Sequence, residues 1–448
     1  MGNDNKGFEI QTGKNNMNKT RILLITLTIL FTNISFPQSG RMNNSKGNET
    51  LQDLIITAVD VSPKLSMLRA KKNVAENKIP QNSNLPNPML MLGLMNLPTN
   101  TFSFNQEPMT QKAIGLQQGI PFPGKLSAME DAAAIDTLII DKEIKDAENE
   151  IRKNVKNKYY SLSFFRKSIR LAEESKKLLE KISEVVSTKY SVSTASQQNL
   201  IKVQLEITNI SDKIEDLKSK ESSTLSELNA LLLREVNSPI QTKTFDSIKT
   251  LDVTVKQLDS LSRTNRPFLQ GIQLSKEKGK LKQNVAEKDY LPNFTLGVQY
   301  GQRGVLEKTG MEQSDFLSFS LGISLPINYG GKISSKVDEA ISMQELYSQQ
   351  YYQALQYLNG VFGTDVADLN SLVERINLFQ DGLLPQAQQN LSSTLASYQV
   401  NKVDFINVID AQNQLFKIET NLYKLKTDYL KKIAELEFLT GTSLSDNR

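Results

Sequence analysis

Apolar residues recur at intervals of three and four along two long stretches of the chain, residues 125–233 and 332–440. In the first stretch the spacing is clearest at Leu200, Val203, Ile207, Ile210, Ile214 and Leu217. In the second it is clearest at Leu415, Ile418, Leu422, Leu425 and Tyr429. This spacing is typical of the seam between helices of a coiled coil. Proline is almost absent and helix formers dominate, so both stretches are predicted to be helical.

A turn interrupts each helical stretch near its middle. The interruptions are at Tyr190-Ser-Val-Ser193 and at Tyr398-Gln-Val-Asn401, where Ser and Asn favour a turn. Each stretch is therefore expected to form a helical hairpin. An arm of about 65 residues is roughly 100 Å long at a rise of 1.5 Å per residue.

Two short segments with alternating patterns precede each hairpin, at 88–95 and 112–121 and again at 294–302 and 315–326. In the last segment Phe316, Ser318, Ser320 and Gly322 alternate with Leu317, Phe319, Leu321 and Ile323. An apolar row then lies on one face and a smaller, more polar row on the other, which suits a wall between lipid and water. About ten residues cross a bilayer when tilted. Four strands cannot close a barrel, so at least two chains, and we expect three, must contribute.

The chain repeats this series with a period of about 207 residues. Leu85-Pro-Asn87 returns as Leu291-Pro-Asn293, and the strand–helix corner Gly124-Lys125 returns as Gly331-Lys332. One helical segment, roughly 51–80 and 256–289, opens each copy and is expected to end near the Leu-Pro-Asn tripeptide. The predicted organisation is an N-terminal extension and signal peptide at 1–38, a first repeat at 39–240 and a second at 241–448.

The amino-acid composition excludes most common catalytic mechanisms, because the chain has no Cys, Trp or His. Thiol nucleophiles, disulfides, imidazole bases and the commonest transition-metal ligand are therefore absent. A net charge of +4 does not indicate nucleic acid as a partner. Gly119-Ile-Pro-Phe-Pro-Gly-Lys125 has the spacing of a phosphate-binding loop, but Leu126 stands where a hydroxyl residue is needed. We expect neither an enzyme nor a cofactor.

The N-terminus indicates export. Lys19 and Arg21 precede an apolar run from Ile22 to Ile34, followed by Ser35, Phe36, Pro37 and Gln38. This order is that of a secretory signal peptide, and the alternative is a retained anchor, for which the run is short. The start of translation is either Met1 or Met17.

The duplicated hairpins resemble the TolC-type outer membrane efflux protein family over nearly all of the mature chain. Tyr398-Gln-Val-Asn-Lys-Val-Asp-Phe-Ile-Asn-Val-Ile-Asp-Ala411 resembles the family's second hairpin tip, and Leu436–Gly441 its usual helix ending. Residues 87–96, 106–111 and 121–125 are similar to the branch that works with heavy-metal RND pumps. The family's usual glycines in the hairpin turns are replaced here by Ser193 and Asn401.

The resemblance implies an α+β membrane protein. Its homotrimer would form a 12-stranded outer-membrane β-barrel, four strands from each chain, that continues into a periplasmic α-helical coiled-coil tunnel. It implies passive export from a Gram-negative cell, with contacts to outer-membrane lipid, a periplasmic adaptor and an inner-membrane RND pump. In this branch the cargo would be heavy-metal cations. Two alternatives remain: a type I secretion or drug-efflux duct of the same build, and a soluble periplasmic coiled-coil scaffold whose apparent strands are loops.

Two sets of residues are candidates for contact with cargo. Asp404, Asn407 and Asp410 follow one another at intervals of three residues, so they are expected near one helix face at the tunnel's narrow end. Asn407 and Asp410 are similar in position to the family's aperture acids, with Asn in place of one of the usual two aspartates. The alternative is a solvated tip that contacts only the adaptor. Met89, Met91 and Met95 share one strand face and have the soft thioethers that suit Cu(I) and Ag(I). The alternative is a lipid-facing row of Met and Leu, in which methionine is an ordinary apolar filler.

Overall fold

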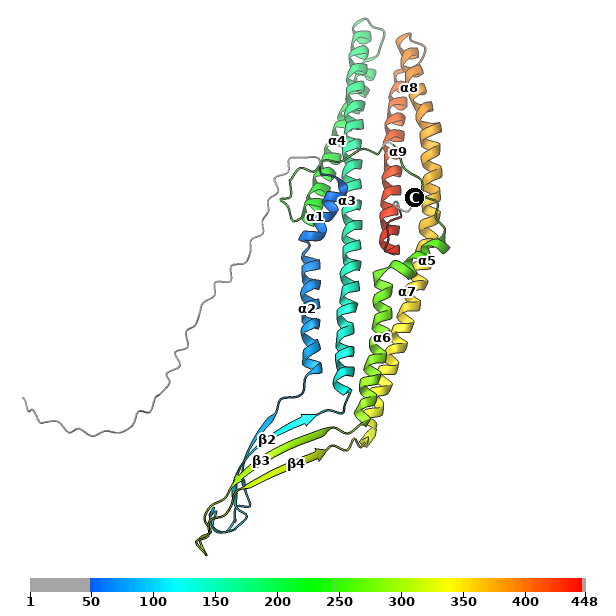
Figure 1. The fold of residues 1–448 in the computed structure, drawn as a ribbon. Coiled ribbons are helices and arrows are strands. Elements are labelled where there is room, and N and C mark those ends of the chain that lie inside the picture. Colours follow the sequence, from blue (N-terminus) through cyan, green and yellow to red (C-terminus); the bar gives the residue numbers. More distant parts are fainter. Residues whose placement is uncertain (1–48, 246, 445–448) are drawn as a thin grey trace, which may run out of the picture. The chain divides into compact units, whose positions relative to one another are not determined.

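The computed structural model describes residues 49–245 and 247–444. The predicted N-terminal extension and signal peptide, 1–38, lie outside these residues. Within them, two tandem sets of helices extend from one end of a single antiparallel sheet (Figure 1).

Each copy contributes one strand pair to the sheet, as predicted. The first pair is β1 (Met89–Met95) and β2 (Gln111–Ile120), and the second is β3 (Phe294–Gln302) and β4 (Phe316–Ile323). The strands are ordered β1-β2-β3-β4, so β2 and β3 join the two copies through antiparallel pairing. The predicted boundaries are within three residues of those observed. The outer edges of β1 and β4 have no partner strand in the described chain.

Both predicted hairpins form, with a long first arm and a shorter second arm. The first consists of α3 (Lys125–Ser191) and α4 (Gln197–Leu231). In the second, the long arm is α7 (Lys332–Asn377), a π-helical segment η3 (Leu378–Leu383) and α8 (Leu384–Gln399), and the return arm is α9 (Phe405–Thr440). The predicted coiled-coil seams are buried or half-buried along α4 and α9.

The helical segment that opens each copy is two helices, not the single one expected. The first copy has α1 (Leu51–Val61) and α2 (Pro63–Ser83). The second has α5 (Val255–Asn265) and α6 (Pro267–Glu287), followed by the 3₁₀ turn η1 (Lys288–Tyr290). Between the helices Ser62 and Arg266 are extended, with ψ of 118° and 117°. Each precedes a proline, whose ring disfavours the helical conformation of the residue before it.

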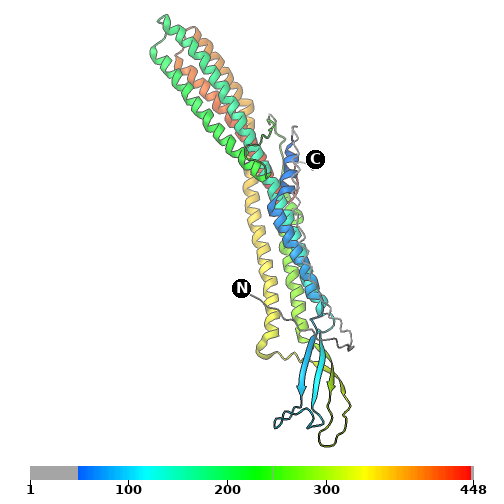
Figure 2. The same cartoon turned by 90° about the vertical axis from the view of Figure 1, so that its left-hand side faces the viewer.

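The helices pack in the same lateral order as the strands. Figure 1 shows α2, α3, α6 and α7 following one another, and α3 packs against both α2 and α6, while α6 packs against α7. Beyond them α4 and α9 pack on α3. The strands connect to the first residues of α3 and α7, whereas the turns of the hairpins follow α3 and α8 (Figure 2). One chain is therefore a strip with an open edge on each side.

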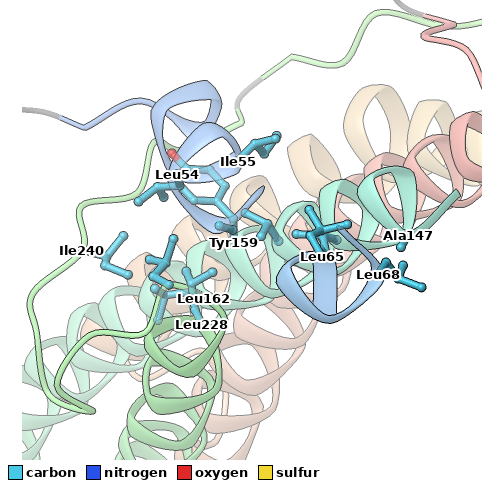
Figure 3. Packing of buried hydrophobic residues seen from close by; sticks show 13 residues of the cluster. Leu54, Ile55, Leu65, Leu68, Ala147, Tyr159, Leu162, Leu228 and Ile240 are labelled. Atoms are coloured by element: carbon cyan, nitrogen blue, oxygen red, sulfur yellow. The ribbon is translucent and has the colours of Figure 1, made fainter. Parts of the chain in front are cut away.

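Buried apolar clusters hold the helices together. Figure 3 shows the cluster in which α1 and α2 pack on α3 and α4, with Leu162 and Leu228 fully buried and Tyr159 nearly so. A second cluster joins α5, α6, α7 and α9 around Phe362 and Tyr429. Each fully buried Leu or Phe contributes about 1.5–3 kcal/mol relative to exposure.

Three tyrosine hydroxyls fix the segment that links the two copies. The hydroxyl of Tyr159 on α3 accepts a hydrogen bond from the backbone N–H of Lys243 at 3.0 Å. On α9, the hydroxyl of Tyr423 accepts from Phe245 at 3.0 Å and that of Tyr429 accepts from Leu251 at 2.7 Å. Helices from both copies therefore satisfy the backbone donors of an otherwise irregular link.

Candidate functional site

The two hairpin ends have the same backbone geometry. Ser193 and Asn401, the two predicted turn residues, have φ of 58° and 59°. Both are in the left-handed region, which Asn tolerates better than Ser. The N–H of Thr194 donates to the carbonyl of Lys189, and the N–H of Lys402 donates to that of Ser397. The turn geometry thus repeats even though the turn residue differs between the copies.

A third apolar cluster joins the two hairpin ends. Val186 and Val203 come from the first hairpin, whereas Phe405 and Val408 come from the second, and all are at most 1% exposed. Tyr398 lies in the same cluster, with its ring 5.6 Å from that of Phe405. The ends of the two hairpins are consequently one packed unit.

Lys189 makes the polar link between the hairpin ends. Its Nζ donates to the carbonyl of Tyr398 at 2.7 Å and to Oδ1 of Asn401 at 2.5 Å. It also lies 4.3 Å from the centre of the Tyr398 ring. The sequence pattern did not single out Lys189, although a difference between the copies marks it, because Ser397 stands at the equivalent position of the second hairpin.

Asp404, Asn407 and Asp410 all lie on the exposed side of the start of α9. Asp404 is the N-cap residue of this helix, and its carbonyl accepts a hydrogen bond from the N–H of Asn407 at 3.1 Å. The residues between them, Phe405 and Val408, turn into the packed cluster. All three polar side chains are therefore exposed at the start of the return arm of the second hairpin.

Each strand–helix corner begins its helix with a left-handed glycine. Gly124 has φ of 82° before α3, and Gly331 has φ of 73° before α7. Nζ of Lys125 forms an ion pair with Oδ1 of Asp289, in the second copy, at 2.7 Å. Lys332, which is equivalent to Lys125 in the second copy, is exposed.

Asp289 joins the two corners. Its Oδ2 forms a second ion pair, with Nζ of Lys336 on α7 at 2.6 Å, so the carboxylate lies between two lysines, Lys125 and Lys336. Burial raises the pKa of Asp289, but its hydrogen bonds to Lys125 and Lys336 outweigh that effect and leave the pKa lowered. The ionised carboxylate is thus the form that ties both long arms to the end of α6.

The strand register places the methionines of β1 on the polar face of the sheet. Met89, Met91 and Met95 share this face with Gln117, Gly115 and Gln111 of β2. The leucines between them lie on the other face, beside Leu116, Val298 and Phe319. The methionines and the leucines of β1 therefore lie on opposite faces of the sheet, because neighbouring residues of a strand point to opposite sides.

None of the helices in the described part of the chain is both long and apolar enough to span a membrane. Among residues 49–245 and 247–444, no group of three or more His, Cys, Asp and Glu side chains is placed to hold a metal ion.

Sequence comparison identifies a family and several relatives. Residues 258–442 match the family described as outer membrane efflux protein. Outer membrane protein TolC of Vibrio cholerae serotype O1 is 21% identical over 247 residues, 53% of this chain and 52% of the relative. TolC of Escherichia coli K12 is 25% identical over 126 residues, 27% of this chain and 24% of the relative. The chain thus spans about half the length of the first, and about a quarter of the second.

Solved structures share the fold over most of the chain. The CusC channel has a TM-score of 0.72 and 19% identity, with 88% of this chain and 92% of CusC covered. VceC, an outer membrane protein of Vibrio cholerae, has a TM-score of 0.72 and 17% identity, with coverage of 88% and 96%. The chain therefore shares its fold with these two proteins. The resemblance to the outer membrane efflux protein family is confirmed in sequence over residues 258–442.

Proposed function

We propose that this chain is one protomer of a homotrimeric outer-membrane duct that passively exports cargo, and that it is not an enzyme. The observation that carries the proposal is a sheet with two unpaired edges and one face that is apolar at its centre, with Lys112, Gln118 and Gln302 towards its ends. Leu92 of β1 and Phe319 of β4 are 74% and 78% exposed in the single chain. Apolar side chains so exposed on a strand require a cover, and lipid provides it.

The two open edges are complementary. Since β1 and β4 run antiparallel to their inner neighbours in a four-stranded sheet, β4 of one copy can continue the sheet by pairing antiparallel with β1 of the next. Helices follow the same lateral order, so α7 and α8 of one copy meet α2 and α4 of the next. Three copies would supply 12 strands and close a barrel above a helical tunnel, which leaves no sheet edge exposed.

The hairpin ends would lie in the periplasm, at the opposite end of the tunnel from the barrel. There the packed tips would contact a periplasmic adaptor, which connects the duct to an inner-membrane RND pump. Asp404, Asn407 and Asp410 would form rings around a threefold aperture. A ring that mixes Asn with Asp repels anions less than a wholly acidic one would.

Heavy-metal cations are the cargo we propose for the system. The support is the similarity of residues 87–96, 106–111 and 121–125 to the heavy-metal RND branch, together with the likeness in fold to CusC. A drug-efflux or type I secretion duct has the same build and differs in the pump attached. Growth of a deletion strain on copper, silver, zinc, cobalt and drugs, with an assay of secreted proteins, separates these cargoes.

Engineered cysteines test the assembly directly, because the chain has none of its own. We would place one at Leu92 in β1 and scan a second through Leu317, Phe319 and Leu321 in β4. Oxidation should join copies into a ladder that ends at three chains, whereas a cysteine at Leu116 in the central strand β2, combined with Leu92→Cys, should form no link between copies. A monomer that stays in solution without detergent and forms no such ladder would refute the duct and favour the soluble scaffold.

A further inference from the structure

The methionine row of β1 (Met89, Met91 and Met95) lies on the face of the sheet that carries amides, hydroxyls and glycines. Across the sheet this face continues through Gln299 of β3 and Ser318 of β4, which are aligned with Met91 through the strand pairing. In the proposed duct the opposite, apolar face contacts lipid. The three thioethers would then line the water-filled interior of the barrel.

Small residues leave room around the methionine row. Gly93 lies on the same face between Met91 and Met95, and a Cβ built there would have only Met95 Cγ within 4 Å, at 3.9 Å. Across from Met91 stands Gly115, which has no side chain to cover it. The three methionine side chains are 61%, 41% and 40% exposed, in chain order. All three side chains are therefore accessible from this face of the sheet.

One thioether is already oriented by amides. Met95 Sδ accepts a hydrogen bond from Nε2 of Gln299 at 2.9 Å and a longer one from Nε2 of Gln111 at 3.8 Å. Hydrogen bonds to a thioether are weak, so a soft cation can displace these donors. Met89 and Met91 are two residues apart, roughly 6.6 Å along the strand. Two unbranched side chains with three rotatable bonds each can bring their sulfurs together across that separation.

We propose that the methionine row is a weak binding site for soft monovalent cations, Cu(I) or Ag(I), inside the duct. Thioethers are soft, uncharged ligands, so they select such ions over Mg²⁺ or Ca²⁺, which take oxygen ligands. No carboxylate of the four strands lies on this face, and the absence of charge keeps binding weak enough for release. The proposal rests on the proposed function, because the duct is what turns this face towards water.

Silver binding to the purified trimer tests the site. Equilibrium dialysis of the full chain in detergent against silver nitrate, in chloride-free buffer, should show about one Ag(I) retained per chain. The M89L/M91L/M95L variant should lose at least tenfold in affinity. A matched control, M67L/M109L/M311L, removes three exposed methionines from elsewhere and should bind as the wild type does.

A variant of the same amino-acid composition tests which face of the sheet carries the silver site. Exchange of Met and Leu at positions 89, 90, 91, 92, 94 and 95 moves the thioethers to the apolar face without changing the amino-acid content, and it should abolish binding by the trimer. Equal silver binding by wild type and M89L/M91L/M95L would overturn the site. Binding by the face-exchanged trimer would overturn its location. Each sample is first shown to be a heat-modifiable trimer on a gel, so loss of the trimer in the wild type would refute the duct, separately from the site.

Discussion

Replacement of Lys189 by Met should loosen the two hairpin ends without unfolding the chain. The substitution keeps a long unbranched side chain but removes the ammonium group that bonds to Tyr398 and Asn401. Met also continues to cover the Tyr398 ring. The change therefore isolates the polar link between the hairpins from the apolar cluster beneath it.

The magnitude follows from the contacts of Lys189. A hydrogen bond from a charged donor is worth about 1.5–3 kcal/mol, and the half-buried position reduces each of the two to about 1 kcal/mol. The cation–π contact adds about 0.5–1 kcal/mol. The total is roughly 2.5–3 kcal/mol, so local separation of the ends should become about 60- to 150-fold more frequent.

Hydrogen exchange of the backbone amides at the hairpin ends measures this opening. Amides of residues 186–203 and 397–408 should exchange faster in K189M, whereas those of the buried clusters near Leu162 and Tyr429 should not change. Lys402→Met is the matched control, because Lys402 is exposed at the same end and forms no ion pair or side-chain hydrogen bond within 49–245 and 247–444. Exchange in K189M that is indistinguishable from K402M would refute the reasoning.

Four further substitutions test the backbone strain, the packing and the ion pairs. Gly441→Ala should destabilise the chain by more than 1 kcal/mol, because φ is 75° and the new Cβ would lie 2.7 Å from Arg266 Cα. Gly360 is a helical glycine with open space around it, so Gly360→Ala should stabilise the chain by about 0.5–1 kcal/mol. Equal urea unfolding midpoints for the two variants would contradict this prediction. Leu162→Ala should cost about 2–5 kcal/mol by urea unfolding, and a cost below 1 kcal/mol would contradict the burial of this side chain. Asp289→Asn should lower stability by about 2 kcal/mol, between the values for surface and buried pairs. Since the pKa of Asp289 in the folded chain is lowered, the difference in stability between wild type and D289N should persist above the ordinary pKa of 3.8 and disappear as the pH falls below it. A stability difference that is unchanged at acid pH would exclude the ion pairs as its cause.

The strands and hairpins were predictable because each depends on local pattern. A period of two in 316–323 and a spacing of three and four in 200–217 are read from the sequence directly. The duplication supported these predictions, because an element predicted in one copy is also predicted at the equivalent position of the other. The division of the opening helices was missed although its signal was present, because Ser62 and Arg266 each precede a proline.

Other features depend on how distant segments meet. The contact of Lys189 with the second hairpin requires that two ends some 210 residues apart in sequence pack together. The π-helical η3 contains Gly382 and ends before Pro385, but those residues alone do not distinguish a π segment from a break. The strand pairing confirms that the methionines of β1 share one face, because residues two apart in a strand point to the same side.

The open edges of the strip have a consequence for cells that carry two versions of the gene. A copy whose β1 edge is blocked, for example by proline at Leu92, still offers a normal β4 edge to its neighbours. It would enter a growing ring and prevent its closure. In the proposed trimer, equal expression of blocked and normal chains leaves about one ring in eight free of blocked copies. Mutations at this edge should therefore behave as dominant, whereas mutations that unfold the whole chain should behave as recessive.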